Sequence, residues 1–341
     1  MHSKHVGRQT VQFDDPPSVI ASAAIAGKKE GEGPLKQFFD HISTDTSFGE
    51  KTWEKAESRM LLLSLQKALK KADLPCSDVD MLFGGDLLNQ CIGTSFAVRD
   101  TEIPFFGLYG ACSTMAEALC LASMAVEGGY ARNAVAITSS HFASAERQYR
   151  LPLEYGGQRT PSAQWTVTGA GAVVLGPGDR PPFINGFTAG NVVDLKVKDA
   201  ANMGAAMAPA FTDTLIKHFS DTGRSPSDYD LIVSGDLGSV GLGLSKELLR
   251  KSGYQMEDNL RDCGIMIYDP TCQDVHAGGS GCGCSASVLS GYLLTQLRKG
   301  TWKRILFCAT GALLSPVSTQ QGESIPSICH AVEISGSRGE S

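Results

Sequence analysis

The stretch that decides the fold is Phe105–Ser140, with the sequence FFGLYGACSTMAEALCLASMAVEGGYARNAVAITSS. Its pattern predicts a sharp turn at Gly110, a helix over Met115–Val126 and a short strand over Ala134–Thr138. The helix is small or apolar on almost every side, which is typical of a helix buried inside a protein. We therefore expect a buried central helix that leads into a buried strand.

Cys112 lies at the start of this helix, just before Ser113 and Thr114, which can cap a helix N-terminus. The helix dipole and the free N–H groups of the first turn favour a thiolate or a bound anion at such a place. The alternative is a small core residue, since free cysteines are among the most buried residue types. The turn before Cys112 favours the functional interpretation.

The composition narrows the class of protein. The chain has 341 residues, which suggests about two domains. Its net charge of −6 and its lack of a long basic run argue against nucleic-acid binding. Ten cysteines without framework spacing, and a polar start without an apolar segment, indicate a reducing compartment and no signal peptide. No apolar run approaches 18 residues, so we expect no membrane span.

Two segments of the chain repeat each other. Ser77–Leu87 (SDVDMLFGGDL) and Ser227–Leu237 (SDYDLIVSGDL) are identical at six of eleven positions, at a spacing of 227 − 77 = 150 residues. Each ends in Gly-Asp, at Asp86 and Asp236. A second correspondence matches residues 110–138 to residues 281–309, at a spacing of 171. The repeats predict two halves of one design, residues 1–180 and 181–341.

The pattern of elements predicts an α/β fold. After a loop over Glu30–Trp53, helices and strands alternate, which implies buried sheets covered by helices, with ligands at the carboxyl ends of the strands. The expected helices, besides the central one, are Glu57–Ala72 and Asn202–Phe219. The further expected strands are Ser18–Gly27, Ser77–Leu88, Trp165–Leu175, Pro182–Leu195, Ser227–Leu237 and Ser327–Ile334.

This duplicated arrangement, with a cysteine at the start of the first central helix, resembles the thiolase and ketoacyl-synthase superfamily. TGAGAVVL at Thr168–Leu175 looks like the strand that ends the first half in ketoacyl synthases. The resemblance implies a thiolase-like α/β/α/β/α layering, a two-fold dimer, and Cys112 as the counterpart of the acyl-accepting cysteine. The condensing-enzyme histidine is absent, since Ser234-Gly235-Asp236 stands in its place. His276 and Cys308 are loose matches to the other catalytic positions of thiolases.

Within that superfamily the chain is most similar to thiolase-like proteins of spore-forming bacteria. The similarity rests on GGDLLNQ (84–90), GLYGACSTMAE (107–117) and DVHAGGSGCGCSA (274–286). It implies a non-catalytic protein without a cofactor that binds dipicolinate, with or without calcium, and serves uptake of the calcium chelate into the developing spore. It also implies membrane-embedded partners from the same operon and a peripheral place at the spore inner membrane.

A dipicolinate site needs groups that hold an anion and a flat slot. The N–H groups at the Cys112 helix and a backbone cradle at Gly278–Gly281 would supply donors, and serine hydroxyls would add to them. A tight turn is the alternative for the glycine run. The predicted ligand-binding residues are Asp86, Cys112, Ser234, Asp236, His276, Gly279, Ser280 and Gly281.

The acidic residues, the histidine and the close cysteine pair each have a second interpretation. Asp86 or Asp236 would shape the pocket or meet calcium, or else satisfy its own loop as an Asx turn. The turn is favoured for Asp236, and both alternatives stay open for Asp86. His276 is either a loop histidine or a base toward Cys112. Cys282-Gly283-Cys284 has no second pair at zinc spacing, so we predict packing and no metal site.

Two further groups complete the list of candidates. Arg147, Arg150 and Arg159 fall in the link Ser139–Gln164, where one of them could pair with a carboxylate, although a solvated surface is the default. Met203, Met207 and Met256 are interpreted as gap-filling core residues. The competing functions are an acyltransferase that uses Cys112 with His276 and Cys308, or a purely structural scaffold.

Overall fold

The computed structural model describes residues 4–148 and 159–338, and within them shows one twelve-stranded sheet and one two-stranded sheet. The main path runs β11-β10-β13-β14-β9-β2-β8-β6-β4-β5, with β1 beside β9 and β3 beside β2. Its strands are β1 Thr10–Gln12, β2 Ser18–Ala26, β3 His41–Ile42, β4 Met81–Gly85, β5 Phe105–Gly107, β6 Ala134–Ser140, β8 Gly169–Gly176, β9 Phe183–Thr188, β10 Leu231–Ser234, β11 Leu260–Asp262, β13 Arg304–Ala312 and β14 Ser327–Ser335. The small sheet pairs β7 Trp165–Thr166 with β12 Gly279–Ser280.

Helices separate and cover the strands. They are α1 Trp53–Ala72, α2 Ile92–Val98, α3 Thr114–Glu127, α4 Phe142–Glu146, α5 Met203–Thr222, α6 Gly238–Lys251, α7 Cys263–Met266, α8 Cys282–Ser287, α9 Leu294–Arg298 and α10 Pro316–Gln320. A π-helical turn, Val288–Leu293, joins α8 to α9.

The two halves of the chain repeat one topology. In the first half β2, β8 and β6 are antiparallel neighbours, and β4 and β5 continue parallel to β6. In the second half β9, β14, β13, β10 and β11 follow the same order and directions. The halves meet where Ser18 of β2 pairs with Phe183 of β9, so they share one continuous sheet. The division predicted at residue 180 falls in the link between β8 and β9.

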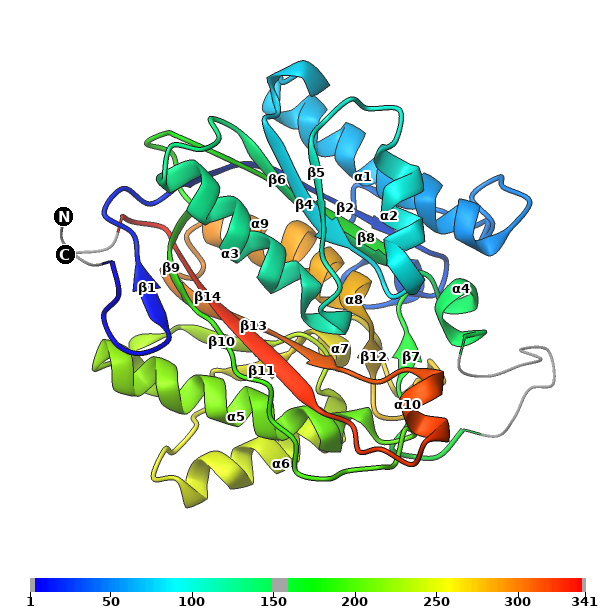
Figure 1. Ribbon diagram of the computed structural model, residues 1–341, viewed down its shortest axis with the longest axis vertical. Coiled ribbons are helices and arrows are strands. Elements are labelled where there is room, and N and C mark those ends of the chain that lie inside the picture. Colours follow the sequence, from blue (N-terminus) through cyan, green and yellow to red (C-terminus); the bar gives the residue numbers. More distant parts are fainter. Residues whose placement is uncertain (1–3, 149–158, 339–341) are drawn as a thin grey trace.

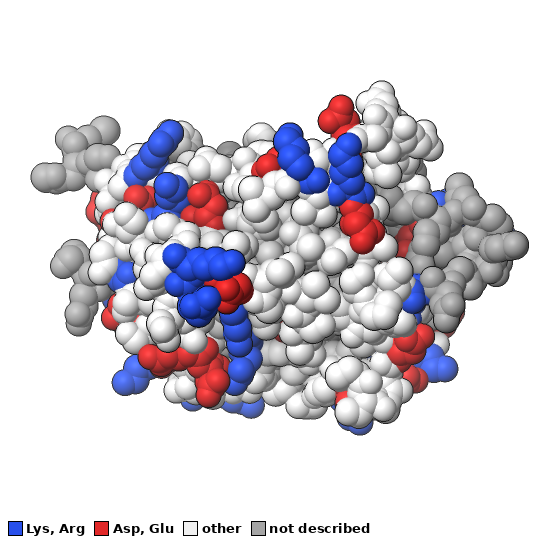
Figure 2. Space-filling view, turned by 90° about the horizontal axis from the view of Figure 1, so that it is seen from below, with Lys and Arg blue, Asp and Glu red and all other residues white. Residues whose placement is uncertain are grey.

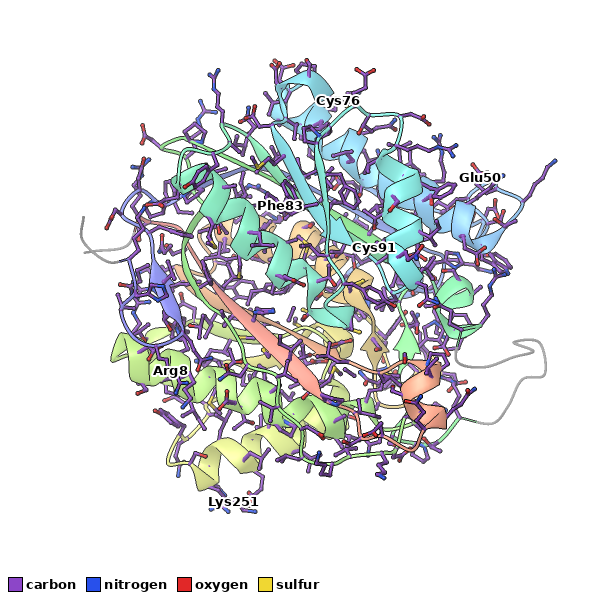
Figure 3. All side chains as sticks on the ribbon, viewed as in Figure 1. Arg8, Glu50, Cys76, Phe83, Cys91 and Lys251 are labelled. Atoms are coloured by element: carbon purple, nitrogen blue, oxygen red, sulfur yellow. The ribbon has the colours of Figure 1, made fainter. Side chains whose placement is uncertain are left out.

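The apolar faces of the helices explain how the helices and the strands are layered. Figure 1 shows α1 and α2 outside the first half, α5 and α6 outside the second, and α3 with α8 and α9 between the two sets of strands. Met115, Ala116, Leu119 and Ala122 of α3 have no exposed surface, as expected for a helix that is apolar on all sides. Phe83 of β4 belongs to the same hydrophobic cluster and lies between the strands and α3 (Figure 3).

The second central helix approaches the first half very closely. A Cβ atom at Gly283 would lie 2.2 Å from the carbonyl oxygen of Gly169 and 2.5 Å from the backbone nitrogen of Ser140. Only glycine leaves room for this contact between α8 and the ends of β8 and β6. In the run before α8, Gly278 and Gly281 have φ values of +116° and +104°, so the tight-turn alternative accounts for these two glycines.

Several predicted boundaries were wrong for local reasons. Helix α1 begins at Trp53 rather than Glu57, because the Thr52 hydroxyl accepts a hydrogen bond from the Lys55 N–H at 3.4 Å and caps the helix. The single strand predicted over Trp165–Leu175 is two strands, because Trp165 and Thr166 pair with Gly279 and Ser280 outside the main sheet. The stretch Pro182–Leu195 opens with a strand, as predicted; this strand, β9, ends at Thr188.

The face of the molecule seen in Figure 2 carries both signs of charge side by side. Blue and red side chains lie close together near one end, and a broad area beside them carries neither. No continuous basic stripe crosses this face. It therefore lacks the electrostatic footprint of a nucleic-acid surface.

Candidate functional site

A cavity of about 340 Å³ lies in front of Cys112. Its walls are mostly small or apolar, with a few polar side chains among them. The lining residues are Leu87, Ala111, Cys112, Ala145, Glu146, Arg159, Thr160, Ala163, Gln164, Thr166, Ala200, Ala201, Met203, Ser280, Ala312 and Leu314. Its volume is within the usual range for small-molecule sites.

The turn before α3 places Cys112 at the cavity. Ala111 has a φ of +53°, a left-handed conformation that non-glycine residues seldom adopt. A short helical turn over Ala111–Ser113 follows, in which the Ser113 N–H donates to the Gly110 carbonyl at 3.2 Å. Cys112 is 6% exposed. The turn thus places Cys112 at the cavity wall. The sequence predicted the turn, but its left-handed residue is Ala111 and not Gly110, whose φ is −94°, and the Ser113 side chain makes no capping bond.

Asp236 is the ionisable group that acts most strongly on Cys112. Both side chains are buried, and the effect of the carboxyl on the thiol is the largest after that of burial itself. Burial raises the pKa of the Cys112 thiol well above its ordinary value, and the neighbouring Asp236 raises that pKa further. This arrangement keeps the sulfur protonated, whereas a cysteine nucleophile needs a base or a positive charge beside it.

Asp236 joins the loops that lie behind the cavity. Its Oδ1 accepts from the Thr310 hydroxyl at 2.9 Å. Its Oδ2 accepts from the Gly281 N–H at 2.9 Å and from the Ser280 hydroxyl at 3.2 Å. Asp236 has no exposed surface, and burial raises the pKa of its carboxyl. The Asx turn favoured for Asp236 was wrong, because its partners come from distant loops.

The N–H groups that were predicted to form an anion cradle at residues 278–281 are largely occupied by hydrogen bonds within the protein. The Gly281 N–H donates to Asp236, and the Gly278 N–H donates to the Val275 carbonyl at 3.0 Å. The carbonyl of Gly279 accepts from the Gln164 side chain at 2.8 Å. Ser280 alone of this run lines the cavity. The loop therefore contributes a wall more than a set of free donors.

Ser234 is turned toward another acid. Its hydroxyl donates to Asp262 Oδ2 at 2.6 Å, and the same carboxyl accepts from the N–H groups of Leu237 at 2.8 Å and Gly238 at 3.2 Å. Burial raises the pKa of Asp262 to about 6, and the charge of Asp236 adds to the effect. Ser234 is not among the residues that line the cavity.

Asp86 satisfies its own loop. Its Oδ1 accepts from the Leu88 N–H at 2.8 Å, and its Oδ2 accepts from the N–H and hydroxyl of Thr94 at 2.7 and 2.6 Å. A second buried acid, Glu57, interacts with it electrostatically, and burial with the charge of Asp86 raises the pKa of Glu57 to about 8. Cys91, which lies beside α2 in Figure 3, belongs to the same loop. Asp86 does not line the cavity.

His276 and the other candidate cysteines do not line the cavity in front of Cys112. His276 Nε2 is 3.1 Å from Asp274 Oδ1, and its side chain is partly exposed. Cys308, Cys282 and Cys284 are fully buried, and none of them lines the cavity. No histidine is among the described residues that line it. The geometry gives Cys112 no imidazole base within the described part of the chain.

Arg159 is the cation of the cavity wall. Its side chain is 9% exposed, and its guanidinium lies over the Trp165 ring, 4.8 Å from the centroid. Nη2 is 2.9 Å from Asp274 Oδ2, while Nη1 is buried without a hydrogen-bond partner among the residues that the structure describes. Arg147 pairs with Glu54 at the surface instead. Arg150 lies outside the described residues.

Most of the cavity wall was not predicted from the sequence, and Gln164 and Met203 are two examples. The Gln164 side-chain nitrogen donates to the carbonyls of Asp236 at 2.7 Å and Gly279 at 2.8 Å, so it joins the two loops behind the cavity. Met203, predicted as a core gap-filler, lines the cavity at the start of α5. Neither has a local motif; only the fold brings them to Cys112. Met207, by contrast, is fully buried.

The described part of the chain contains no candidate metal centre and no helix that could span a membrane. In residues 4–148 and 159–338, no group of three or more His, Cys, Asp or Glu side chains is placed to hold a metal ion. No helix in these described ranges combines the length and the apolar character that crossing a bilayer requires.

The duplicated topology and the buried cysteine at the head of α3 define a thiolase-like protein. A solved 3-oxoacyl-[acyl-carrier-protein] synthase III from Aquifex aeolicus VF5 matches with a TM-score of 0.57 and 14% identity, over 94% of this chain and 99% of that one. The OleA E117Q structure from Xanthomonas campestris matches with a TM-score of 0.60 and 14% identity, over 95% and 99%. At such identities the similarity concerns the fold alone.

The family model for stage V sporulation protein AD (SpoVAD) matches residues 7–335, and the chain belongs to this family. The stage V sporulation protein AD of Bacillus subtilis (strain 168) is 46% identical over 340 residues, which cover 99% of this chain and 100% of that protein. The resemblance to thiolase-like proteins of spore-forming bacteria is thereby confirmed.

Proposed function

We propose that the protein binds dipicolinate in the cavity at Cys112 and serves uptake of the calcium chelate into the developing spore. Dipicolinate is a flat pyridine ring with two carboxylates. The cavity offers small apolar walls for the ring, such as Ala163 and Leu314, and one buried guanidinium for a carboxylate, that of Arg159. Membership in a sporulation protein family supports the process that the ligand serves.

The observation that carries the proposal is the incomplete pairing of Arg159. A buried charge is costly unless every part of it is paired, and Nη1 lacks a partner among the described residues. A guanidinium presents two parallel N–H donors that match a carboxylate, and such charge-assisted bonds are stronger than neutral ones. A carboxylate bound in the cavity would complete the pairing.

We propose binding without acyl transfer. Cys112 keeps its proton because burial and Asp236 both raise its pKa. The described cavity wall contains no histidine that would accept this proton. Dipicolinate needs a closed, partly apolar slot and an anion partner but no nucleophile. The burial and acid contact of Cys112 therefore favour a ligand-binding protein on a thiolase-like scaffold.

Isothermal titration calorimetry with dipicolinate tests the proposal. Arg159→Gln should weaken binding by about thirtyfold, which corresponds to roughly 2 kcal/mol for a lost charged hydrogen bond. The matched control is Arg147→Gln, since Arg147 pairs with Glu54 and does not line the cavity; its affinity should stay within about twofold of wild type. Absence of dipicolinate binding by the wild type, or full affinity in a folded Arg159→Gln variant, would refute the proposal.

We also propose that the protein forms a two-fold dimer through β5. This strand ends the sheet, so one edge of it has no partner strand among the described residues. Phe106 is 50% exposed on it, with Phe96 and Tyr109 similarly exposed nearby. An apolar, unpaired edge favours pairing with a second copy. Light scattering should give a dimer for the wild type and a monomer for Phe106→Glu; a wild-type monomer at micromolar concentration would refute this arrangement.

We further propose that the protein lies at the spore inner membrane as a peripheral protein, beside membrane-embedded products of the same operon. The membership in a sporulation family supports this placement. Fractionation of sporulating cells tests it. The protein should sediment with forespore membranes and be released by high salt, but should no longer sediment when the operon's membrane proteins are deleted. Sedimentation that is independent of those proteins would contradict the proposal.

A further inference from the structure

Asp274 places a carboxylate next to Arg159, the cation of the cavity wall. Its Oδ2 is 2.9 Å from Arg159 Nη2, and its Oδ1 is 3.1 Å from His276 Nε2. Its backbone carbonyl accepts from Lys29 Nζ and from Arg159 Nη2, both at 3.1 Å. One aspartate therefore contacts three basic side chains.

These basic groups are crowded together. Lys29 Nζ lies 3.8 Å from the centroid of the Trp165 ring, the same ring that carries Arg159. Burial lowers the pKa of Lys29, the Arg159 charge lowers it further, and Asp274 opposes both effects. The Arg159 guanidinium in turn holds the pKa of Asp274 below its usual value. Asp274 thus acts on both adjacent cations, and Glu30 and Glu32 add to its effect on Lys29.

Asp274 holds Arg159 from the solvent side. Its side chain is 74% exposed, whereas that of Arg159 is 9% exposed and lies in the cavity wall. Asp274 itself does not line the cavity. An exposed carboxylate is already largely hydrated, so it loses little when it turns fully into water. The pair can therefore open at small cost when another carboxylate reaches the guanidinium.

We propose that Asp274 competes with the ligand's carboxylate for Arg159 and so sets the affinity and the charge selectivity of the cavity. This inference rests on the proposed function, which it deepens. When a dicarboxylate binds, one of its carboxylates takes the guanidinium, and Asp274 turns outward. Lys29, which lies over the same Trp165 ring as Arg159, adds positive charge that favours the second carboxylate. Asp274 is a positioning residue for Arg159, and it discriminates against ligands with a single charge, which gain less from the cations.

Calorimetry on the full chain tests the competition, with dipicolinate, isophthalate and the monocarboxylate picolinate as probes. Asp274→Asn keeps the shape of the side chain and the backbone bonds but removes the charge. It should tighten dipicolinate and isophthalate binding by about tenfold, as expected for removing one nearby like charge. Picolinate should gain less, about threefold. Asp274→Glu keeps the charge and should bind within about threefold of wild type.

The matched control is Asp100→Asn. Asp100 is also an exposed aspartate paired with an arginine, Arg99, but it does not line the cavity. Its substitution should leave all three affinities unchanged, and circular dichroism checks that each variant is folded.

The outcomes separate the competition from the proposed function. Equal affinity of wild type and Asp274→Asn for dipicolinate would overturn the competition and leave the proposed function standing. Binding by Asp274→Asn alone would support the competition and overturn dipicolinate binding by the natural protein. If neither protein binds any dicarboxylate, both ideas are wrong. A picolinate gain as large as the dipicolinate gain would overturn the selectivity argument.

Discussion

Asp86 and Asp236 stand at matching ends of matching strands, β4 and β10, in the two halves of the chain. Asp86 bonds to Leu88 and Thr94, two and eight residues away along the chain. Asp236 bonds to Ser280 and Thr310, which are 44 and 74 residues away. The same Gly-Asp motif thus stabilises a local loop in the first half and joins distant loops behind the cavity in the second.

Each half also brings a second buried acid to its aspartate. Glu57 of α1 interacts with Asp86, and Asp262 at the end of β11 interacts with Asp236. The second pair acts on Cys112, since the charge of Asp236 raises the pKa of that thiol. The matching strand ends therefore differ in their surroundings: Asp86 stabilises a local loop, and Asp236 joins loops at the cavity in front of Cys112.

The largest expected effect comes from filling the cavity on the Asp236 side. Cys112→Trp should place an indole in the space of about 340 Å³ and weaken dipicolinate binding by more than about a hundredfold. Cys112→Ser changes little volume and should bind within about threefold of wild type. Calorimetry, with circular dichroism as the folding control, makes the measurement. Undiminished binding by a folded Cys112→Trp protein would move the site elsewhere.

The comparison itself is tested by the two alanine variants of the strand-end aspartates. Each leaves several donors without an acceptor, so each should lower the free energy of unfolding by about 2–4 kcal/mol. Asp236→Ala should also displace Ser280 and weaken dipicolinate binding by about tenfold, whereas Asp86→Ala should bind within about threefold of wild type. Urea unfolding and calorimetry give the two quantities. Equal losses of affinity in both variants would remove the distinction drawn between the halves.

The pH dependence of stability should distinguish the second buried acids of the two halves, Glu57 and Asp262. Burial raises the pKa of Glu57 from 4.5 to about 8, so the folded protein loses stability as pH rises between those values. For Asp262 the corresponding window lies between 3.8 and about 6. Glu57→Gln should therefore raise the melting temperature relative to wild type by roughly 2–5 °C at pH 9 but not at pH 5. The change caused by Asp262→Asn should be the same at pH 7 and pH 9.

Thermal unfolding followed by circular dichroism at pH 5, 7 and 9 separates the two acids. A Glu57→Gln effect that does not change between pH 5 and pH 9 would show that Glu57 titrates normally. An Asp262→Asn effect that grows between pH 7 and pH 9 would exchange the roles assigned to the two carboxyls.

The smallest expected effect is the lack of reaction at Cys112. Because its thiol stays protonated beside Asp236, iodoacetamide at pH 7.5 should modify the exposed Cys272 first and leave Cys112 unmodified. Incubation with acyl-coenzyme A should likewise give no acyl adduct at Cys112. Peptide mass spectrometry reads both results. A stoichiometric adduct at Cys112 with turnover would reinstate the acyltransferase.

The sequence alone determined the duplicated α/β plan, because periodicity and repetition are local properties of the chain. The buried helix α3, its strained turn and the placement of Cys112 follow from small residues and glycines that lie next to one another in sequence. The Gly-Asp strand ends were visible for the same reason. Strand boundaries such as Thr166 were missed, since pairing with Ser280 is a contact between residues more than a hundred positions apart.

Only the tertiary structure decided which side chains meet at the cavity. Arg159 and Gln164 carry no motif, and their importance comes from burial beside loops that arrive from the other half. Asp86 and Asp236 end matching stretches of sequence. The sequence favoured a local turn for Asp236, whereas the structure gives the local loop to Asp86 and distant partners to Asp236. Local sequence sets backbone conformation, whereas burial, pairing and pKa depend on neighbours that only the folded chain brings within a few ångströms.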